Sequence, residues 1–469
     1  MVVRTLFRVK KVAVIGAGPC GLSAAKYLVA QKAFDEIVVF EQSAEVGGVW
    51  NYSKTPTSTL HVPQTDPFCP PDPPIFPADG GPAVFPSPMY DLLHTNIPCP
   101  LMRFSDLPFP SGLLIFPPRE AVQDYLVEYS QDVRSLIRFS TKVKDVRLRR
   151  DGDVDQWDVD VEATDGSNPK SLAFDAVVVA SGHYATTYTP DITNIKEFHS
   201  AHPSVITHAK LYRSPASYAG KKVVVVGNSA SGVDIAKQVQ RAGATVLLSV
   251  REPTAEDQLE HIGAEEVPEI TEFLVAEKGV RLKDSRIEQH IDAIIFCTGY
   301  LFAFPFLESL EPPLLTNGRR VCGLYKDFLH IGHPTLAFPG LPIRVVPFSF
   351  SESQAAIFAR IWANALPLPS KREMREWEER AAHERGPAFH VYPKDGDVEY
   401  LKEMHAWASK APSGKEPPVW TDEQVWQRHT CAAAKLQFEK TGRVAKSLSE
   451  LGFDFEPKPV NAGSTQELL

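Results

Sequence analysis

Apolar runs near the amino terminus alternate with an amphipathic segment. Residues 12–15 form a continuous apolar run, as expected of a strand buried on both faces of a parallel sheet. A glycine-containing turn follows, then a helical pattern over residues 22–31 and a second strand pattern over Glu36–Phe40. This order predicts a strand–turn–helix–strand unit of an α/β fold.

The same pattern returns in the middle of the chain. Lys222–Val226 predicts a strand, residues 233–241 a helix and Thr245–Val250 the next strand. Two similar stretches, residues 175–183 and 292–300, stand on either side of this second unit. We interpret them as the points where the chain leaves one domain and returns to it. The prediction is an α/β fold with two Rossmann-like dinucleotide-binding domains, one inserted into the other, with boundaries at residues 1–187, 188–296 and 297–469.

The remaining segments predict simpler structure. Residues 56–118 are dense in proline, so regular structure should be sparse there. A helical pattern follows over residues 119–135. Alternating polar and apolar positions over residues 142–148 and 157–163 are typical of an antiparallel meander.

Composition excludes some classes of protein and partner. Hydrophobic residues make up 43% of the chain and charged residues 23%, which is ordinary for a globular protein. The net charge of −9 argues against nucleic acid as the main partner. No apolar leader stands before the first strand, no apolar run is long enough to span a membrane, and the last residues match no anchor signal. We expect a cytoplasmic protein with no membrane anchor.

The first glycine turn has the spacing of a dinucleotide site. Gly16, Gly18 and Gly21 follow a strand and open a helix in a G-x-G-x-x-G pattern. The first glycine makes the turn, the second lets backbone approach a pyrophosphate and the third lets helix pack on strand. Glu41 ends the next strand, where a carboxylate accepts from ribose hydroxyls. This turn is therefore predicted to bind a dinucleotide with an unmodified ribose, FAD.

The second turn differs at two informative positions. Ser229 stands between Gly227 and Gly232 where the middle glycine would be, and Arg251 ends the following strand. A cation there suits a 2′-phosphate, which predicts NADPH, although the neighbouring Glu252 would repel a phosphate if it pointed inward. The predicted NADPH contacts from this turn are Gly227, Asn228, Ser229, Ser231, Gly232 and Arg251.

Two dinucleotide sites in one chain indicate hydride delivery to a flavin and leave the final electron acceptor open. Six cysteines are scattered, with no close pair for thiol redox chemistry and no grouping with histidine that predicts a metal site. O2, a quinone or an organic acceptor all remain compatible with these spacings.

Further motifs are similar to those of the flavin-containing monooxygenases, the class B flavoprotein monooxygenase family. Residues 47–50 follow Glu41 as the family's GG-x-W does. Residues 89–104 are similar to its Y-x-x-L-x-T-N-x-P-x-x-x-M segment, and residues 296–300 to its F-A-T-G-Y element. These matches extend over most of the chain, which resembles a soluble member of the fungal or yeast kind.

A linker fingerprint of the family, F-x-G-x-x-x-H-x-x-x-Y/W, is kept in part. Phe198, His208 and Tyr212 match it, whereas Ser200 stands near the glycine position and Ala209 replaces the usual serine. The spacing from phenylalanine to histidine is longer, so we expect a rebuilt loop. The residues that follow the histidine are more similar to this family than to the Baeyer–Villiger group.

The resemblance implies an NADPH- and O2-dependent monooxygenase. It would oxygenate a soft nucleophile, sulfur or nitrogen, of a small molecule through an FAD C4a-hydroperoxide. Asn96 would lie at the reactive edge of the flavin as the candidate catalytic residue, and an oligomer is compatible with the sequence. The cofactor contacts implied by the resemblance are Gly48, Trp50 and Gln354 for FAD, and His208 and Tyr212 for NADPH. The domain divided between residues 1–187 and 297–469 would then bind FAD, and the inserted domain NADPH.

Other activities stay open on sequence. The altered linker keeps an NADPH oxidase or quinone reductase of the same fold under consideration, as well as a Baeyer–Villiger or N-hydroxylating relative. A flavin-bound sensing protein with little turnover is a further alternative. No motif marks the substrate pocket, so the sequence does not predict the substrate.

Overall fold

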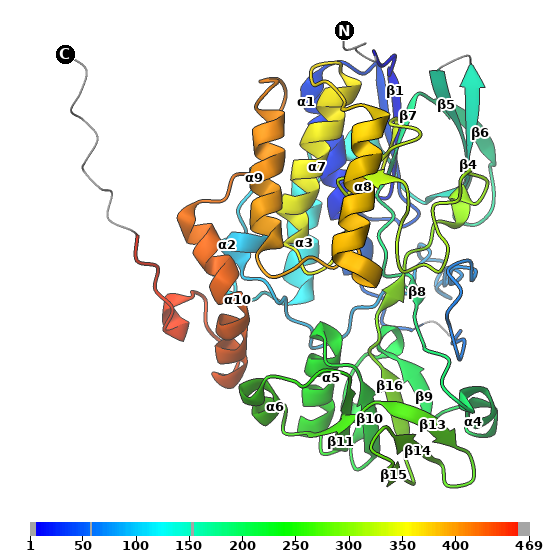
Figure 1. The fold of residues 1–469 in the computed structure, drawn as a ribbon, viewed down its shortest axis with the longest axis vertical. Helices are drawn as coiled ribbons and strands as arrows, with labels where there is room; N and C mark the ends of the chain where they lie inside the picture. Colours follow the sequence, from blue (N-terminus) through cyan, green and yellow to red (C-terminus); the bar gives the residue numbers. More distant parts are fainter. Residues whose placement is uncertain (1–5, 57–58, 152–153, 458–469) are drawn as a thin grey trace.

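Two separate sheets organise the chain (Figure 1). The computed structural model describes residues 6–56, 59–151 and 154–457. The predictions of no leader and no anchor rest partly on residues 1–5 and 458–469. These residues lie outside the described range.

The first sheet has seven strands in the order β18-β19-β20-β7-β1-β2-β3. The strands from β20 to β3 are parallel, and β18, β19 and β20 pair antiparallel. They are β1 (Lys11–Ile15), β2 (Glu36–Phe40), β3 (Ile137–Arg138), β7 (Ala176–Val179), β18 (Leu324–Tyr325), β19 (Leu329–His330) and β20 (Leu336–Ala337). The predicted apolar runs of β1 and β7 are buried in the middle of this sheet.

The second sheet has five parallel strands in the order β12-β11-β10-β16-β9. They are β9 (Ile206–His208), β10 (Lys222–Val226), β11 (Thr245–Val250), β12 (Glu265–Pro268) and β16 (Ala293–Phe296). The predicted strands at β10 and β11 are confirmed with the same bounds. In Figure 1 this sheet fills the lower part, below the first sheet and its helices.

The two similar stretches of sequence are the third strand of each unit. They contain β7 and β16, which lie beside β1 and β10 respectively. Asp175 Oδ2 accepts from the N–H of Lys11 at 2.8 Å, and Asp292 Oδ2 accepts from the N–H of Lys222 at 3.0 Å. Each aspartate thus fixes the start of its neighbouring strand. The repetition therefore reflects two copies of one sheet arrangement.

Where the chain passes between the units, its two crossings run side by side. β8 (Thr186–Thr187) pairs antiparallel with β17 (Tyr300–Leu301). Between these crossings lie the second sheet and a small antiparallel sheet that the sequence did not predict. This small sheet comprises β13 (Ile270–Leu274), β14 (Gly279–Leu282) and β15 (Ile287–Glu288). The predicted meander is confirmed as β4 (Thr141–Asp151), β5 (Val154–Ala163) and β6 (Lys170–Phe174).

Helices cover both sheets, and some of their ends differ from prediction. α1 and α5 each begin three residues earlier than predicted, and in α1 this places Pro19 in the first helical turn, where proline is tolerated. The helix predicted to end at residue 135 ends at Tyr129, because the Ser130 hydroxyl donates to Val127 O at 2.7 Å and the chain turns toward β3. The first-unit helices are α1 (Pro19–Gln31), α2 (Cys99–Met102), α3 (Arg119–Tyr129), α7 (Pro347–Trp362), α8 (Lys371–Arg385), α9 (Gly396–Ala408) and α10 (Asp422–Lys440), and the others are α4 (Ile195–Ala201), α5 (Ala230–Arg241) and α6 (Glu256–Ile262).

The proline-rich segment lies against both units with little regular structure, as predicted. In its described residues α2 is the one helix, and short isolated bridges replace strands. Asp72 in this segment pairs with the buried Lys210 beyond β9. The altered linker forms α4, in which the Ser200 hydroxyl donates to Lys196 O at 2.9 Å. The stretch from Phe198 to His208 is therefore the end of α4, a turn at residues 202–205 and β9.

Candidate dinucleotide and oxygenation site

In the first turn, packing of the protein itself requires two of the three glycines. Gly16 has a φ of +100°, and a Cβ on it would lie 2.6 Å from Ala180 O at the end of β7. A Cβ on Gly21 would lie 1.9 Å from Gly16 O. A Cβ on Gly18 would meet no protein atom closer than Gly48 Cα, at 3.5 Å. Gly18 is therefore not required by protein packing, which fits a position kept small for a ligand.

The second turn repeats this geometry. Gly227 has a φ of +102°, and a Cβ on it would lie 2.9 Å from Cys297 O at the end of β16. A Cβ on Gly232 would lie 1.8 Å from Gly227 O. Ser229 occupies the place of Gly18 and is exposed. The two turns thus share one backbone geometry, and the second carries a side chain, that of Ser229, at its middle position.

Both helices begin without a side-chain cap. The first residue before α1 is Gly18, and before α5 it is Ser229, whose hydroxyl makes no capping hydrogen bond. A serine at this position ordinarily accepts from the first N–H groups of the helix. Because Ser229 does not, those N–H groups are left for another acceptor. Free N–H groups and the positive end of the helix dipole suit a pyrophosphate. The residues present therefore fit two dinucleotides.

Glu41 lies at the end of β2 and closes the first turn. Its carboxylate accepts from the N–H of Ala17 at 2.7 Å and from the N–H of Ser43 at 2.8 Å. Burial raises the pKa of the Glu41 carboxyl, and these two amides oppose the shift. Each oxygen has a second lone pair available. The carboxylate can therefore still accept from ribose hydroxyls.

Arg251 lies at the end of β11, on the open side of the second turn. Its side chain is 74% exposed, and its Nε lies 2.6 Å from Glu269 Oε1. Asn228 Nδ2 donates to Glu252 O at 2.9 Å and to Thr254 Oγ1 at 3.0 Å. Asn228 therefore holds the end of β11 beside the start of α5. Ser231, on the first turn of α5, is half-buried.

The segment that carries Asn96 is attached to both units. Tyr90 OH donates to Asp234 Oδ2 on α5 at 2.6 Å, and the hydroxyl of Tyr52, just after Trp50, donates to Asp91. The Asn96 side chain is exposed, while its carbonyl accepts from the Cys431 thiol at 3.0 Å. Asn96 thus lies on a fixed backbone with a free side chain.

Three predicted cofactor contacts are buried and engaged by the protein. The His208 ring nitrogens lie 3.2 Å from Gly299 O and 3.1 Å from the N–H of Lys210, and burial lowers the pKa of His208 to about 3. Tyr212 OH donates to Gln238 Oε1 at 3.0 Å. Gln354 Oε1 accepts from the N–H of Gly340 at 2.8 Å, and its Nε2 donates to Tyr400 OH at 3.1 Å. These polar groups face protein atoms and position the surrounding backbone, and the contacts of the three residues with the cofactors stay a prediction.

Gly48 and Trp50 lie beside the first turn. Gly48 has a φ of +57°, and a Cβ on it would lie 3.1 Å from Gly18 Cα. Trp50 is half-buried and packs against the main apolar core. The GG-x-W stretch therefore forms one wall of the space next to Gly18.

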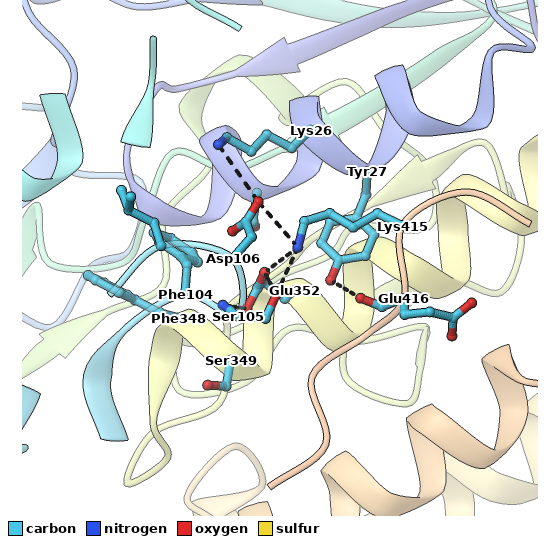
Figure 2. Close-up of polar contacts among 12 residues, drawn as sticks. Lys26, Tyr27, Phe104, Ser105, Asp106, Phe348, Ser349, Glu352, Lys415 and Glu416 are labelled. Carbon is cyan, nitrogen blue, oxygen red and sulfur yellow. Dashed lines mark hydrogen bonds and ion pairs between the residues drawn. The ribbon is translucent and has the colours of Figure 1, made fainter. Parts of the chain in front are cut away.

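Sequence reasoning missed the role of Glu352 (Figure 2). This fully buried α7 side chain accepts from Ser105 N–H at 2.9 Å and Ser105 Oγ–H at 2.7 Å, and it pairs with Lys415 Nζ at 3.1 Å. Figure 2 shows Lys415 between Glu352 and Asp106, to which it lies at 3.5 Å. The network anchors the chain that follows α2 to α7. The signal in the sequence was a carboxylate within a helix that has one other charged residue, Arg360, because a buried carboxylate requires a partner.

The thiols offer no redox pair. All six cysteines are free. Cys20 lies in the first turn, where burial raises the pKa of its thiol to about 12. A thiol in that state is a poor nucleophile, and its role is packing against Gly340.

The turns, the two sheets and the bridging segment define a protein with two dinucleotide sites, and comparisons with known proteins agree. Residues 85–256 and 262–415 match the family described as flavin-binding monooxygenase-like, and residues 14–91 match the NAD(P)-binding Rossmann-like domain. The thiol-specific monooxygenase of Saccharomyces cerevisiae is 31% identical over 440 residues, which cover 90% of this chain and 91% of the relative.

Solved structures share the fold. The S-allyl-L-cysteine S-oxygenase of Allium sativum superposes with a TM-score of 0.75 at 24% identity, covering 96% of this chain and 98% of that one. Tmm from a Pelagibacter strain superposes with a TM-score of 0.68 at 25% identity, covering 92% and 91%.

The class is therefore a two-dinucleotide flavoprotein with two Rossmann-like domains. The chain belongs to the flavin-binding monooxygenase-like family. It is a flavoprotein monooxygenase that uses FAD and NADPH. Among the residues that the structure describes, no helix has the length and apolar character needed to cross a bilayer.

Proposed function

We propose that this monooxygenase transfers one oxygen atom of O2 to a soft nucleophile of a small molecule, with thiol or sulfide sulfur as the preferred target. The observation that carries the proposal is the attachment of the Asn96 segment to both units, through Tyr90 and through Asp91. The Saccharomyces cerevisiae relative is a thiol-specific monooxygenase, which supports sulfur over nitrogen.

FAD is assigned to the first turn and NADPH to the second. The family model matching residues 14–91 is named for NAD(P), but Glu41 at this turn favours an unmodified ribose. Arg251 at the second turn favours a 2′-phosphate. The domain boundaries proposed for the two cofactors are those predicted from the sequence: 1–187 and 297–469 for FAD, and 188–296 for NADPH.

When bound, FAD would supply in its reduced form the electrons that activate O2, as the family resemblance implies. The protein contributes position and exclusion of water. The exposed Asn96 amide would donate to the activated oxygen and to the nicotinamide ribose, because its backbone is held by Cys431 while its side chain is free. No general base on the protein is required, since a soft nucleophile attacks oxygen directly.

A product assay tests this function. The purified, FAD-loaded protein would receive NADPH, O2 and either cysteine-type thiols, alkyl sulfides or tertiary amines, with NADPH, H2O2 and oxygenated product all quantified. We expect sulfides to give sulfoxides, and thiols to give a sulfenic acid that condenses with a second thiol to a disulfide and water, with little H2O2. Oxidation of NADPH to H2O2 alone, whatever the substrate, would support the NADPH oxidase alternative. Product from amines but not from sulfur compounds would overturn the preference for sulfur.

A further inference from the structure

The end of α10 carries a row of charges that faces the unit assigned to NADPH. This unit, residues 188–296 around the second sheet, is called the NADPH unit below. Lys435 and Glu439 lie four residues apart on one side of α10, and Arg443 lies just after the turn that ends the helix. Lys435 Nζ lies 3.1 Å from Glu439 Oε1, and Arg443 Nε lies 2.6 Å from Glu439 Oε2. In Figure 1, α10 lies at the boundary between the upper helices and α5 with α6.

A buried ion pair links this row to α5. Lys237 Nζ lies 2.8 Å from Glu439 Oε2, and the two side chains are 5% and 4% exposed. Lys237 also lies 3.0 Å from Asp234 Oδ1 on its own helix. A buried pair of this kind contributes little net stability compared with apolar packing, but it fixes one relative position of the elements that hold it. The pair therefore sets how the NADPH unit sits against α10.

Arg443 joins three elements through one guanidinium. Besides Glu439, it contacts Asp234 Oδ1 through Nη2 at 3.3 Å, and its Nη1 donates to Leu92 O at 3.1 Å. Leu92 belongs to the segment that carries Asn96. The planar, five-donor guanidinium can make all three contacts together, which a lysine ammonium at the same position could not.

The same two helices hold the Asn96 segment at three points. Tyr90 OH donates to Asp234 Oδ2 on α5, Leu92 O accepts from Arg443, and Asn96 O accepts from the Cys431 thiol of α10. The candidate catalytic residue and the NADPH unit thus share their supports. A shift of α10 would move one relative to the other.

We propose that α10 is a strut that fixes the distance between Asn96 and the NADPH unit, with Arg443 and Glu439 as its positioning residues. This proposal rests on the proposed function and deepens it, because it assigns the coupling of NADPH oxidation to oxygenation to residues outside both glycine turns. Misplacement of a reacting group by about 1 Å can reduce a rate by about 100-fold. Loss of the Arg443 contacts should therefore affect oxygenation more than flavin reduction, because the Lys237–Glu439 pair still holds the NADPH unit against α10.

Arg443→Gln tests the strut, and Lys440→Gln is the matched control. Lys440 is exposed near the end of the same helix, so its variant removes the same charge without touching the junction. Arg443 has a φ of +63°, and glutamine carries the same Cβ, so the backbone preference is unchanged. We expect Arg443→Gln to lower product per NADPH by about tenfold with a matching rise in H2O2. Flavin reduction should change by less than about threefold, and Lys440→Gln should behave as wild type.

Hydrogen–deuterium exchange gives a second measurement that needs no turnover. In Arg443→Gln, amides of residues 90–96 and of α5 should exchange faster, while those of α1 and β1 should not. Arg443→Lys should restore part of the coupling and part of the slow exchange, since it keeps the positive charge but lacks the forked guanidinium.

The possible results distinguish failure of the strut from failure of the proposed function. If the wild-type protein forms no oxygenated product, the proposed function fails, and the exchange measurement alone judges the strut. If the wild type is coupled and Arg443→Gln is equally coupled with unchanged exchange at residues 90–96, the strut is refuted while the function stands. Equal loss in Arg443→Gln and Lys440→Gln would show an effect of charge alone and would also refute it.

Discussion

Coenzyme choice should depend on Arg251, which ends β11 beside the start of α5. A hydrogen bond to a charged group contributes about 1.5–3 kcal/mol, and about 1.4 kcal/mol corresponds to tenfold in affinity. Removing such a contact should therefore weaken NADPH by about 10- to 150-fold. Since the Arg251 side chain is 74% exposed and its Nε is committed to Glu269, we expect the lower end, about tenfold.

The assay compares two coenzymes and three variants. Dissociation constants of NADP+ and NAD+ are measured by titration of the FAD-loaded protein at two salt concentrations. Arg251→Ala should weaken NADP+ and leave NAD+ nearly unchanged, and the difference should shrink at high salt because an exposed contact is screened. Glu269→Gln should strengthen NADP+, because it frees the guanidinium.

Lys283→Gln is the matched control for this experiment. Its Nζ lies 3.4 Å from Glu269 Oε2 and its side chain is 69% exposed, so the variant removes an equal charge from the same carboxylate. NADP+ affinity should not fall in this variant. An equal loss of NADP+ and NAD+ in Arg251→Ala would show that Arg251 is structural and would refute the assignment.

Three further predictions address FAD, oxygenation and stability. Gly18→Val should release FAD from a protein that still folds, whereas Gly21→Ala should unfold it, because its Cβ would lie 1.9 Å from Gly16 O; a folded, fully yellow Gly18→Val protein would contradict this. Asn96→Ala should keep NADPH-dependent flavin reduction while H2O2 replaces product, and an unchanged product yield per NADPH would make Asn96 a turn residue. Burial raises the pKa of Glu439, but Lys435 and Lys237 outweigh burial and lower the pKa from 4.5 to about 2. Relative to the protonated side chain, the charged one therefore stabilises the folded state by about 3 kcal/mol at neutral pH. That contribution is lost as pH falls from about 4.5 toward 2, so the difference in unfolding free energy between wild type and Glu439→Gln should narrow across this range, and a difference independent of pH would contradict the assignment.

The sequence by itself determined the two β–α–β units. Runs such as Lys222–Val226 and Thr245–Val250 were predicted with the bounds that the structure has. A strand buried on both faces is apolar at nearly every position, so its ends are visible in the sequence. The glycine spacings were equally informative, since Gly16 and Gly227 need a positive φ and Gly21 and Gly232 leave no room for a Cβ. Local sterics dictate these positions.

Tertiary structure alone decided which side chains face open space. His208, Tyr212 and Gln354 stand in motifs that predicted cofactor contacts, yet each is buried with its polar groups bound to distant protein atoms. The sequence pattern marks these positions but does not show which protein atoms their side chains bind.

The long-range contacts within the first unit and between the two units also came only from the structure. Glu352 with Ser105 and Lys237 with Glu439 join residues separated by 247 and 202 positions. No local period or spacing encodes such pairs, because their partners are chosen by how the helices pack and by the need to neutralise a buried charge. The sequence therefore determined the two dinucleotide units, and packing determined how Asn96 is held between them.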